Sequence, residues 1–130
     1  MHLKQLIPML NVADIHVSLD FYRRALGFEV VSDPQMLTEF HWATIRSGDA
    51  ELMVSETDAP PPLALGINPQ KSSSWPTIFY FYPDDVRALH ARVVAENFSP
   101  TEVEERVYGM LEFSLQDPDG HLLSFGEPVA

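Results

Sequence analysis

The sequence predicts an α+β fold in which a βαβββ unit occurs twice, with the sheets curved around a crevice. Each half of the 130-residue chain reads as a strand, a helix and room for three further strands. An acidic residue followed by an aliphatic one opens both helices, as Asp14-Ile15 and Asp85-Val86. Because one helix covers only one face of a sheet, the other face must close against the second unit or a partner chain. We therefore expect a single domain over 1–130, with repeats at 1–56 and 77–130.

The first repeat opens with a strand and a helix. The strand is a mostly apolar run over 3–12, and Pro8 within it indicates a sheet edge or a bulge, because proline has no backbone N–H to donate. Asp14 is the expected helix N-cap and Gly27 the expected C-cap. Between the caps, an apolar stripe recurs at helical spacing on Ile15, Leu19, Tyr22 and Leu26.

Strand and turn signals fill the rest of the first repeat. Residues 28–31 are extended before an Asp33-Pro34 turn, and a strand over 39–46 continues through a Gly48-Asp49 turn into a returning strand over 51–55. A two-residue turn fixes the register of this hairpin. It pairs Ala43 with Val54 and Ile45 with Leu52 on an aliphatic face, and Trp42 with Ser55, Thr44 with Met53 and Arg46 with Glu51 on a mixed face.

A linker predicted over 57–76 separates the repeats, because three successive prolines fit neither a helix nor a strand ladder. It contains Trp75, which could seal a dimer interface or cover the crevice. The second repeat then shows a strand over 78–82 and a helix from Asp85 to Asn97. Strands follow near 101–107, 109–116 and 121–126, the last two joined by an Asp-Pro-Asp-Gly turn.

Composition and charge exclude several classes of function. A formal net charge of −11 would repel nucleic-acid phosphates and anionic membranes, and it leaves a preference for cationic ligands open. The absence of cysteine excludes disulfides, thiolate metal sites and cysteine nucleophiles. The sequence also has no glycine-rich phosphate loop and no G-x-S-x-G elbow. The short apolar run at the N-terminus is not a secretory signal, so we expect a cytoplasmic protein.

Four stretches of the sequence carry a family resemblance. They are IPMLNVAD (7–14), FYRRALGF (21–28), GDAELM (48–53) and YGMLEFSLQDPDGHLLSFGEP (108–128). In this order and separation they resemble the vicinal oxygen chelate superfamily, which includes glyoxalase I, extradiol dioxygenases, and fosfomycin and bleomycin resistance proteins. The chain is most similar to the bleomycin-resistance-like branch. That resemblance implies a dimer that holds a drug in crevices between sheets.

The resemblance also identifies where a metal would lie. Enzymes of the superfamily hold a divalent metal with His and Glu from inward-facing strand positions. In this sequence those positions fall on Ile7, Ile78, Glu51 and Ser124, of which only Glu51 is a good metal ligand. The scattered histidines form no H-x-H or H-x-x-x-H pair. We therefore expect no metal, no cofactor and no catalytic residue; Glu51 either pairs with Arg46 or faces a cationic ligand.

The aromatic residues give the binding hypothesis. Phe40 and Trp42 share the mixed face of their strand, and Tyr80 and Tyr82 share the face of Ile78. Tyr108 precedes a glycine where bleomycin resistance proteins often have an aromatic residue. If the inward face of the family is kept, these rings converge on one crevice that suits planar ligands. The alternative is that they are core residues.

The sequence and the resemblance together predict a homodimer that binds and sequesters a bulky, partly planar natural product such as a peptide antibiotic. The expected ligand-binding residues are Phe40, Trp42, Tyr80, Tyr82 and Tyr108 for stacking, Met53 and Met110 for adaptable packing, and Glu51, Ser55 and Glu112 for polar contacts. One alternative is a divalent-metal lyase, isomerase or dioxygenase with displaced ligands. Another is an accessory binding protein of a biosynthetic pathway.

Overall fold

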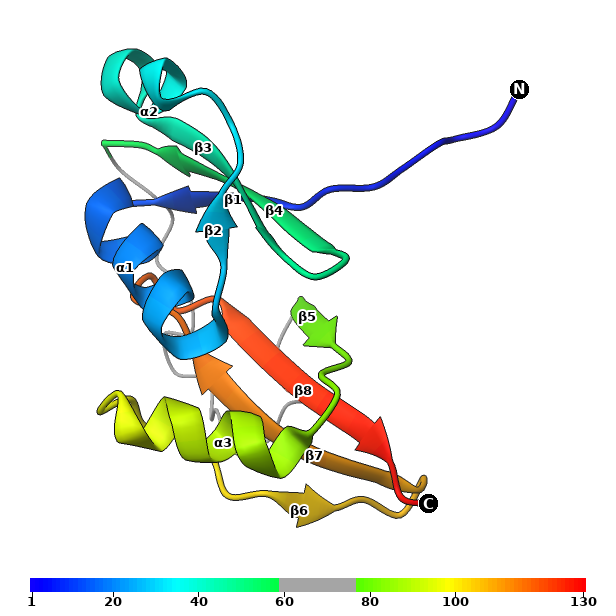
Figure 1. Cartoon of the computed structure of the whole chain (residues 1–130). Helices are drawn as coiled ribbons and strands as arrows, with labels where there is room; N and C mark the ends of the chain where they lie inside the picture. Colours follow the sequence, from blue (N-terminus) through cyan, green and yellow to red (C-terminus); the bar gives the residue numbers. More distant parts are fainter. Residues whose placement is uncertain (59–76) are drawn as a thin grey trace. The chain divides into compact units, whose positions relative to one another are not determined.

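A computed structural model of the chain describes residues 1–58 and 77–130. Most of the linker predicted over 57–76, Trp75 included, lies outside the described residues. Within these residues the chain divides into two compact units, one of residues 1–23 and 27–58 and one of residues 24–26 and 77–130. Each unit contains a four-stranded open sheet and at least one helix (Figure 1), so the duplicated α+β fold is confirmed.

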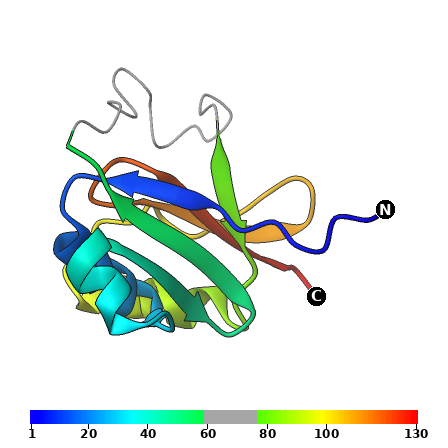
Figure 2. The same cartoon turned by 90° about the horizontal axis from the view of Figure 1, so that it is seen from above.

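The first unit has a mixed sheet with the strand order β1-β4-β3-β2. Its elements are β1 (Met9–Val12), α1 (Ile15–Leu26), β2 (Glu29–Val30), α2 (Pro34–Phe40), β3 (Trp42–Ser47) and β4 (Ala50–Glu56). β1 runs parallel to β4 and the other pairs are antiparallel, with β1 and β4 side by side in Figure 2. The first strand is shorter than the predicted 3–12. It starts directly after Pro8, whose carbonyl accepts from the Met53 backbone N–H at 2.8 Å.

The local signals at both ends of α1 are confirmed. The Asp14 side chain accepts hydrogen bonds from the backbone N–H groups of His16 and Val17, at 3.0 and 3.2 Å. Gly27 ends the helix in the left-handed region at φ 72°, where glycine carries no steric penalty. Of the predicted stripe, Ile15 and Tyr22 are fully buried.

The hairpin of β3 and β4 has the predicted register at every pair from Trp42–Ser55 to Ser47–Ala50. Its aliphatic face is core, because Ala43, Ile45, Leu52 and Val54 are all at most 2% exposed. Its mixed face is half-buried except at Arg46, which is exposed. A two-residue turn thus determined which side chains of this hairpin are buried.

The strand predicted over 39–46 is wrong in its first residues, which belong to α2. Asp33 is the N-cap of this helix and accepts from the Gln35 N–H at 2.9 Å, while Pro34 occupies the first helical turn. His41 ends the helix at φ 51°, and the strand begins only at Trp42. Phe40 is therefore the last residue of a helix, 63% exposed, and does not share a strand face with Trp42.

The second unit repeats the topology with the strand order β5-β8-β7-β6. Its elements are β5 (Ile78–Phe81), α3 (Val86–Ala95), β6 (Glu104–Glu105), β7 (Met110–Gln116) and β8 (Leu122–Pro128). α3 packs against β7 and β8. Beneath it, the Phe125 ring stacks on Phe81 and Phe113 with centroids 5.4 and 4.8 Å apart. This aromatic face is the core of the unit.

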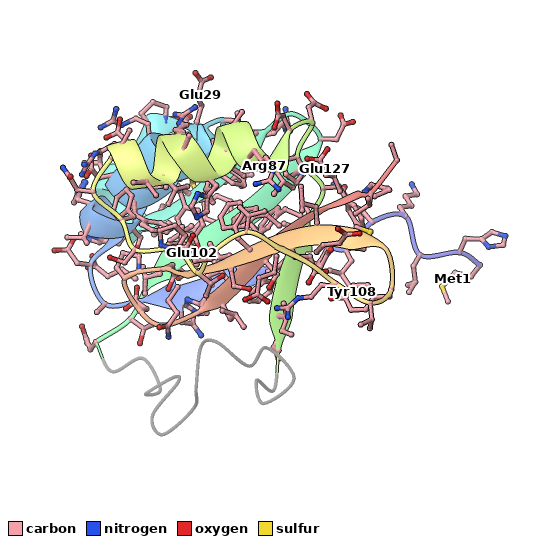
Figure 3. The ribbon with its side chains drawn as sticks, turned by 90° about the horizontal axis from the view of Figure 1, so that it is seen from below. Met1, Glu29, Arg87, Glu102, Tyr108 and Glu127 are labelled. Atoms are coloured by element: carbon pink, nitrogen blue, oxygen red, sulfur yellow. The ribbon has the colours of Figure 1, made fainter. Side chains whose placement is uncertain are left out.

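A pair of glutamates reveals the duplication at the level of single residues. The N–H of Ile15, the first residue of α1, donates to Glu56 at 2.9 Å; the N–H of Val86, the first residue of α3, donates to Glu127 at 2.8 Å (Figure 3 labels Glu127 at the start of α3). Each glutamate follows its partner by 41 residues and lies on the last strand of its unit. The matching bonds show that the two halves share more than the order of their elements.

No helix within residues 1–58 or 77–130 is long and apolar enough to cross a membrane.

Candidate functional site

The candidate site lies on the face of the second sheet that points away from α3. Side chains alternate along a strand, so if Phe113 and Phe125 face the helix, their neighbours Glu112 and Gly126 face the other side. Tyr80 lies on this same face, opposite Ser124. This face thus carries serines, a carboxylate and tyrosines, whereas the face towards α3 is apolar.

Glu112 is the centre of this face. Its side chain is only 8% exposed, which is unusual for a carboxylate. The Tyr80 hydroxyl donates to Oε2 at 2.6 Å, and the Tyr108 hydroxyl donates to Oε1 at 2.5 Å. Arg106 also donates to Oε1 through Nε at 3.2 Å, and its other branch reaches Glu104 at 3.1 Å. The buried charge is therefore paired and hydrogen-bonded, as a stable buried carboxylate requires.

This environment keeps both tyrosines protonated. Burial raises the pKa of Tyr80 above its ordinary value, and the hydrogen bond to Glu112 and the negative charge of that residue raise it further. The pKa of Tyr108 is raised by the same causes, with the nearby Arg106 charge acting against them. The phenols act here as fixed donors, and proton release from them is disfavoured.

The tyrosine rings remain partly accessible above this hydrogen-bonded centre. Tyr80 is 37% exposed, Tyr108 63% and Tyr82 75%. Tyr80 and Tyr82 lie with ring centroids 5.1 Å apart and planes inclined by 56°. Tyr108 comes from the turn between β6 and β7, where it is labelled in Figure 3. These three rings form an aromatic surface in which the hydroxyls of Tyr80 and Tyr108 are hydrogen-bonded to Glu112.

Farther along the same strands, Ser114 and Ser124 bond to each other through their hydroxyls at 2.9 Å. A pocket of about 240 Å³ opens next to Ser114, between β7 and the segment that follows α3. Thr101 closes one side of it, since its Oγ1 accepts from the Ser114 N–H at 2.8 Å. None of the residues predicted for the site lines this pocket.

In the first unit the structure brings together part of the predicted set. Trp42 and Ser55 are cross-strand neighbours, and Met53 lies on the same face; all are half-buried. Glu51 forms an ion pair with Arg46, with Oε1 2.6 Å from the nearer guanidinium nitrogen, and so has the cross-strand partner that the register predicts. Phe40, on α2, is separate from this strand face.

In the second unit the structure brings together Tyr80, Tyr82, Tyr108 and Glu112. Met110 pairs with Pro128 on the same face and is half-buried. Glu112, predicted as a polar contact for the ligand, is hydrogen-bonded to Tyr80, Arg106 and Tyr108 of its own chain, and its contact with a ligand stays a prediction. The sequence analysis missed Arg106 and Gly126. The alternation of β8 would have placed Gly126 on this face, but no sequence signal indicated its closeness to Tyr80.

The metal positions implied by the family do not fit a metal ion. When the Asp14 and Asp85 caps and the Glu56 and Glu127 side chains of the two units are superposed in sequence, Met9 of β1 corresponds to Tyr80 of β5. Met9 pairs with Met53 across the sheet, and Tyr80 pairs with Ser124. The position that corresponds to Ser124 is therefore Met53, whose thioether is a poor ligand for hard divalent metals, and not Glu51. Among the described residues, no group of three or more histidines and carboxylates is arranged to hold a metal.

Comparison with known proteins gives a family and a fold. The family model of the Glyoxalase/Bleomycin resistance protein/Dioxygenase superfamily matches residues 3–125. No curated protein matches the chain.

Among solved structures, TioX from Micromonospora sp. ML1 is similar with a TM-score of 0.73 and 17% identity, over 96% of this chain and 98% of that one. A bleomycin resistance determinant encoded on transposon Tn5 has a TM-score of 0.71 and 20% identity, over 98% and 100%. A bleomycin-binding protein complexed with bleomycin has a TM-score of 0.66 and 22% identity, over 96% and 98%. At these identities the likeness shows the fold.

Proposed function

The chain belongs to the Glyoxalase/Bleomycin resistance protein/Dioxygenase superfamily, and from this premise we propose that it binds and sequesters a bulky, partly planar natural product such as a peptide antibiotic. In this proposal binding is stoichiometric and needs no metal, and the binding protein is a cytoplasmic homodimer. The observation that carries the proposal is the tyrosine cluster, in which Tyr80 and Tyr108 are fixed to Glu112 while their rings stay exposed.

The tyrosine cluster has the properties of a stacking surface. A ring whose hydroxyl is already held loses little side-chain entropy when a ligand stacks on it, so binding costs less free energy than with a mobile ring. An aromatic pair contributes about 0.5 to 1.5 kcal/mol beyond the burial of apolar area. The buried Glu112 keeps its charge paired, so the ligand does not have to neutralise it.

The first unit carries the remaining predicted contacts on a sheet face of its own. Trp42 offers a second stacking ring, Met53 an adaptable thioether and Ser55 a hydroxyl, all on one half-buried sheet face. Glu51 adds a carboxylate at the far end of this face. Its Oε1 pairs with Arg46, and its Oε2 accepts a hydrogen bond of 3.5 Å from the Gln5 side chain. Phe40 stays in the proposal as a separate aromatic contact from α2.

Two of the structural neighbours are described as a bleomycin resistance determinant and a bleomycin-binding protein, which supports a binding role and supplies a probe. Bleomycin titrated into the protein in a calorimeter should give saturable binding of one molecule per chain. Trp42→Ala should weaken this binding about three- to tenfold, because it removes one stacking ring. Binding of unchanged affinity would remove Trp42 from the site.

The matched control is Val17→Ala, which also removes exposed apolar surface, but from α1. It should leave the affinity unchanged. Phe40→Ala tests the helix residue in the same way. If the control variant weakens binding as much as Trp42→Ala does, the loss reflects stability and the assignment of Trp42 fails.

Metal content tests the other half of the proposal. The purified protein should contain less than stoichiometric divalent metal, and bleomycin binding should survive treatment with a chelator. A stoichiometric metal ion that disappears in Glu51→Ala would contradict metal-free binding and favour a metal-dependent lyase, isomerase or dioxygenase.

A further inference from the structure

We infer that Gly126 is the positioning residue of the tyrosine cluster formed by Tyr80, Tyr82 and Tyr108. Because Gly126 has no side chain, the Tyr80 ring can lie across β8, and the Tyr80 hydroxyl then reaches Glu112 on β7. The inference rests on the proposed function and deepens it. It identifies the residue that shapes the surface on which a planar aromatic group of the ligand would stack.

The strand register places the three residues together. Glu112 pairs with Gly126 across β7 and β8, and Tyr80 pairs with Ser124 of β8, on the same face as Gly126. Tyr80 starts from β5, on the far side of β8, and its hydroxyl bonds to the carboxylate of β7 at 2.6 Å. The ring must therefore cross β8, and it does so at the glycine.

The space above Gly126 is filled by this ring. A Cβ atom built on Gly126 would overlap the Tyr80 hydroxyl and would lie 2.7 Å from Cζ of the same ring and 3.2 Å from Cε of Met110. Outside their own residue and its chain neighbours, real Cβ atoms essentially never lie within 3.0 Å of another heavy atom. Even alanine at position 126 must therefore push Tyr80 aside.

The backbone does not require glycine at this position. Gly27, Gly48, Gly109 and Gly120 have positive φ angles, whereas Gly126 does not. In the first unit the corresponding residue of β4 is Ser55, which pairs with Trp42 as Gly126 pairs with Glu112. This strand position thus accepts a side chain when no tyrosine crosses it.

Displacing Tyr80 would change the whole surface. Oε2 of Glu112 would lose its tyrosine donor, and the ring would lose its inclined contact with Tyr82 at 5.1 Å. Glu112 would then be a buried carboxylate with fewer partners, which is unfavourable. A planar ligand would meet a mobile ring in place of a fixed one.

A double-mutant cycle on the full chain tests this inference with bleomycin as the probe. Gly126→Ala and Tyr80→Ala should each weaken calorimetric binding about three- to tenfold, and the double variant should be no weaker than Tyr80→Ala alone. Wild-type affinity in Gly126→Ala would overturn the inference. A double variant whose affinity falls by the product of the two single fold-changes would also overturn the inference, because the two residues would then act independently.

A second measurement needs no ligand. In the wild type, ultraviolet titration of tyrosine ionisation should show Tyr80 silent near its ordinary pKa of about 10. Gly126→Ala should add one ionising tyrosine in this range, and adding Tyr80→Phe should remove it again. Identical titrations of wild type and Gly126→Ala would overturn the inference, whereas absence of bleomycin binding by the wild type would contradict only the proposed function.

Thermal unfolding covers the case in which Gly126→Ala folds poorly. If the overlap with Tyr80 is the cause, Gly126→Ala should lower Tm strongly in the wild type and only slightly in the Tyr80→Ala background. Equal decreases in both backgrounds would mean that the strand needs glycine for another reason, and the inference would fail.

Discussion

The carboxylate of Glu112 organises the aromatic residues around it. Tyr80 and Tyr108 reach it from β5 and from the turn before β7, and Arg106 compensates its charge. Each tyrosine keeps its proton because burial and the neighbouring carboxylate both oppose a phenolate. Glu112 thereby holds Tyr80, 32 residues away in the sequence, beside its near neighbours Arg106 and Tyr108.

These raised pKa values predict how stability depends on alkaline pH. In the unfolded chain the tyrosines ionise near pH 10, but in the folded chain Tyr80 and Tyr108 ionise only at higher pH. The unfolded state therefore loses protons first, and the free energy of unfolding should fall as pH rises through about 10. Urea unfolding between about pH 9 and pH 11 measures this slope.

The double variant Tyr80→Phe/Tyr108→Phe should lose this tyrosine-dependent part of the slope. Tyr82→Phe is the matched control, because Tyr82 touches the Tyr80 ring but is not among the groups that bond to Glu112. If the double variant and the wild type have the same slope, the folded tyrosines ionise at ordinary pH and the hydrogen bonds to Glu112 are too weak to matter.

At the scale of elements, each principal helix is attached to the last strand of its own unit by one glutamate. Glu56 and Glu127 accept from the first N–H of α1 and α3, groups that have no partner within the helix. The negative charge also complements the positive end of the helix dipole. The Asp caps satisfy other N–H groups of the same turns, so both signals act together.

This attachment should contribute measurably to stability. We expect Glu127→Ala to lower the free energy of unfolding by about 2 kcal/mol and Glu127→Gln by about 1 kcal/mol, because the amide keeps an acceptor but loses the charge. Glu56→Ala and Glu56→Gln should behave alike. Chemical denaturation measures the change, with exposed Glu102→Gln as the control that should have little effect.

If Glu127→Ala and Glu102→Gln lower the free energy of unfolding equally, the bond from Val86 to Glu127 contributes nothing to stability. The two units would then share the position of this bond but gain no stability from it. If Glu56 and Glu127 differ strongly, the two units depend on this attachment to different extents.

At the scale of the molecule, the open faces of the sheets lead us to expect a second copy of the chain. One principal helix per sheet leaves the opposite face to be covered by the other unit or by a partner chain. These faces carry Trp42, Met53, Tyr80 and Tyr108, partly exposed within the described residues. A dimer would carry twice the charge of −11 and would favour a cationic ligand.

Sedimentation equilibrium tests the homodimer. The expected mass is about twice the 14.7 kDa of one chain, at micromolar concentration and with or without added bleomycin. A mass of one chain over the whole concentration range would contradict the homodimer. Dimers that form only with bleomycin would mean that the ligand completes the interface.

The sequence by itself determined the parts of this protein that depend on neighbouring residues. The Asp14 and Asp85 caps, the Gly27 end of α1 and the register around Gly48 follow from local backbone chemistry, so the duplicated fold was predictable from them. The error at 39–41 was also local, because Asp33-Pro34 starts a helix as readily as it forms a turn.

Only the tertiary structure decided the character of the site. The bond from Tyr80 to Glu112 and the passage of the Tyr80 ring over Gly126 join strands that lie far apart in the sequence. The burial of Glu112 and its ion pair with Arg106, six residues away, depend on how β7 packs in the folded sheet. Alternation along a strand predicts the face on which a residue lies, and it placed Tyr80 and Tyr82 on the face of Ile78, whereas Tyr108 was predicted from the family resemblance. It does not predict how far a ring extends across that face. The direction of the Tyr80 ring depends on the neighbouring side chains and on the absence of a side chain at Gly126.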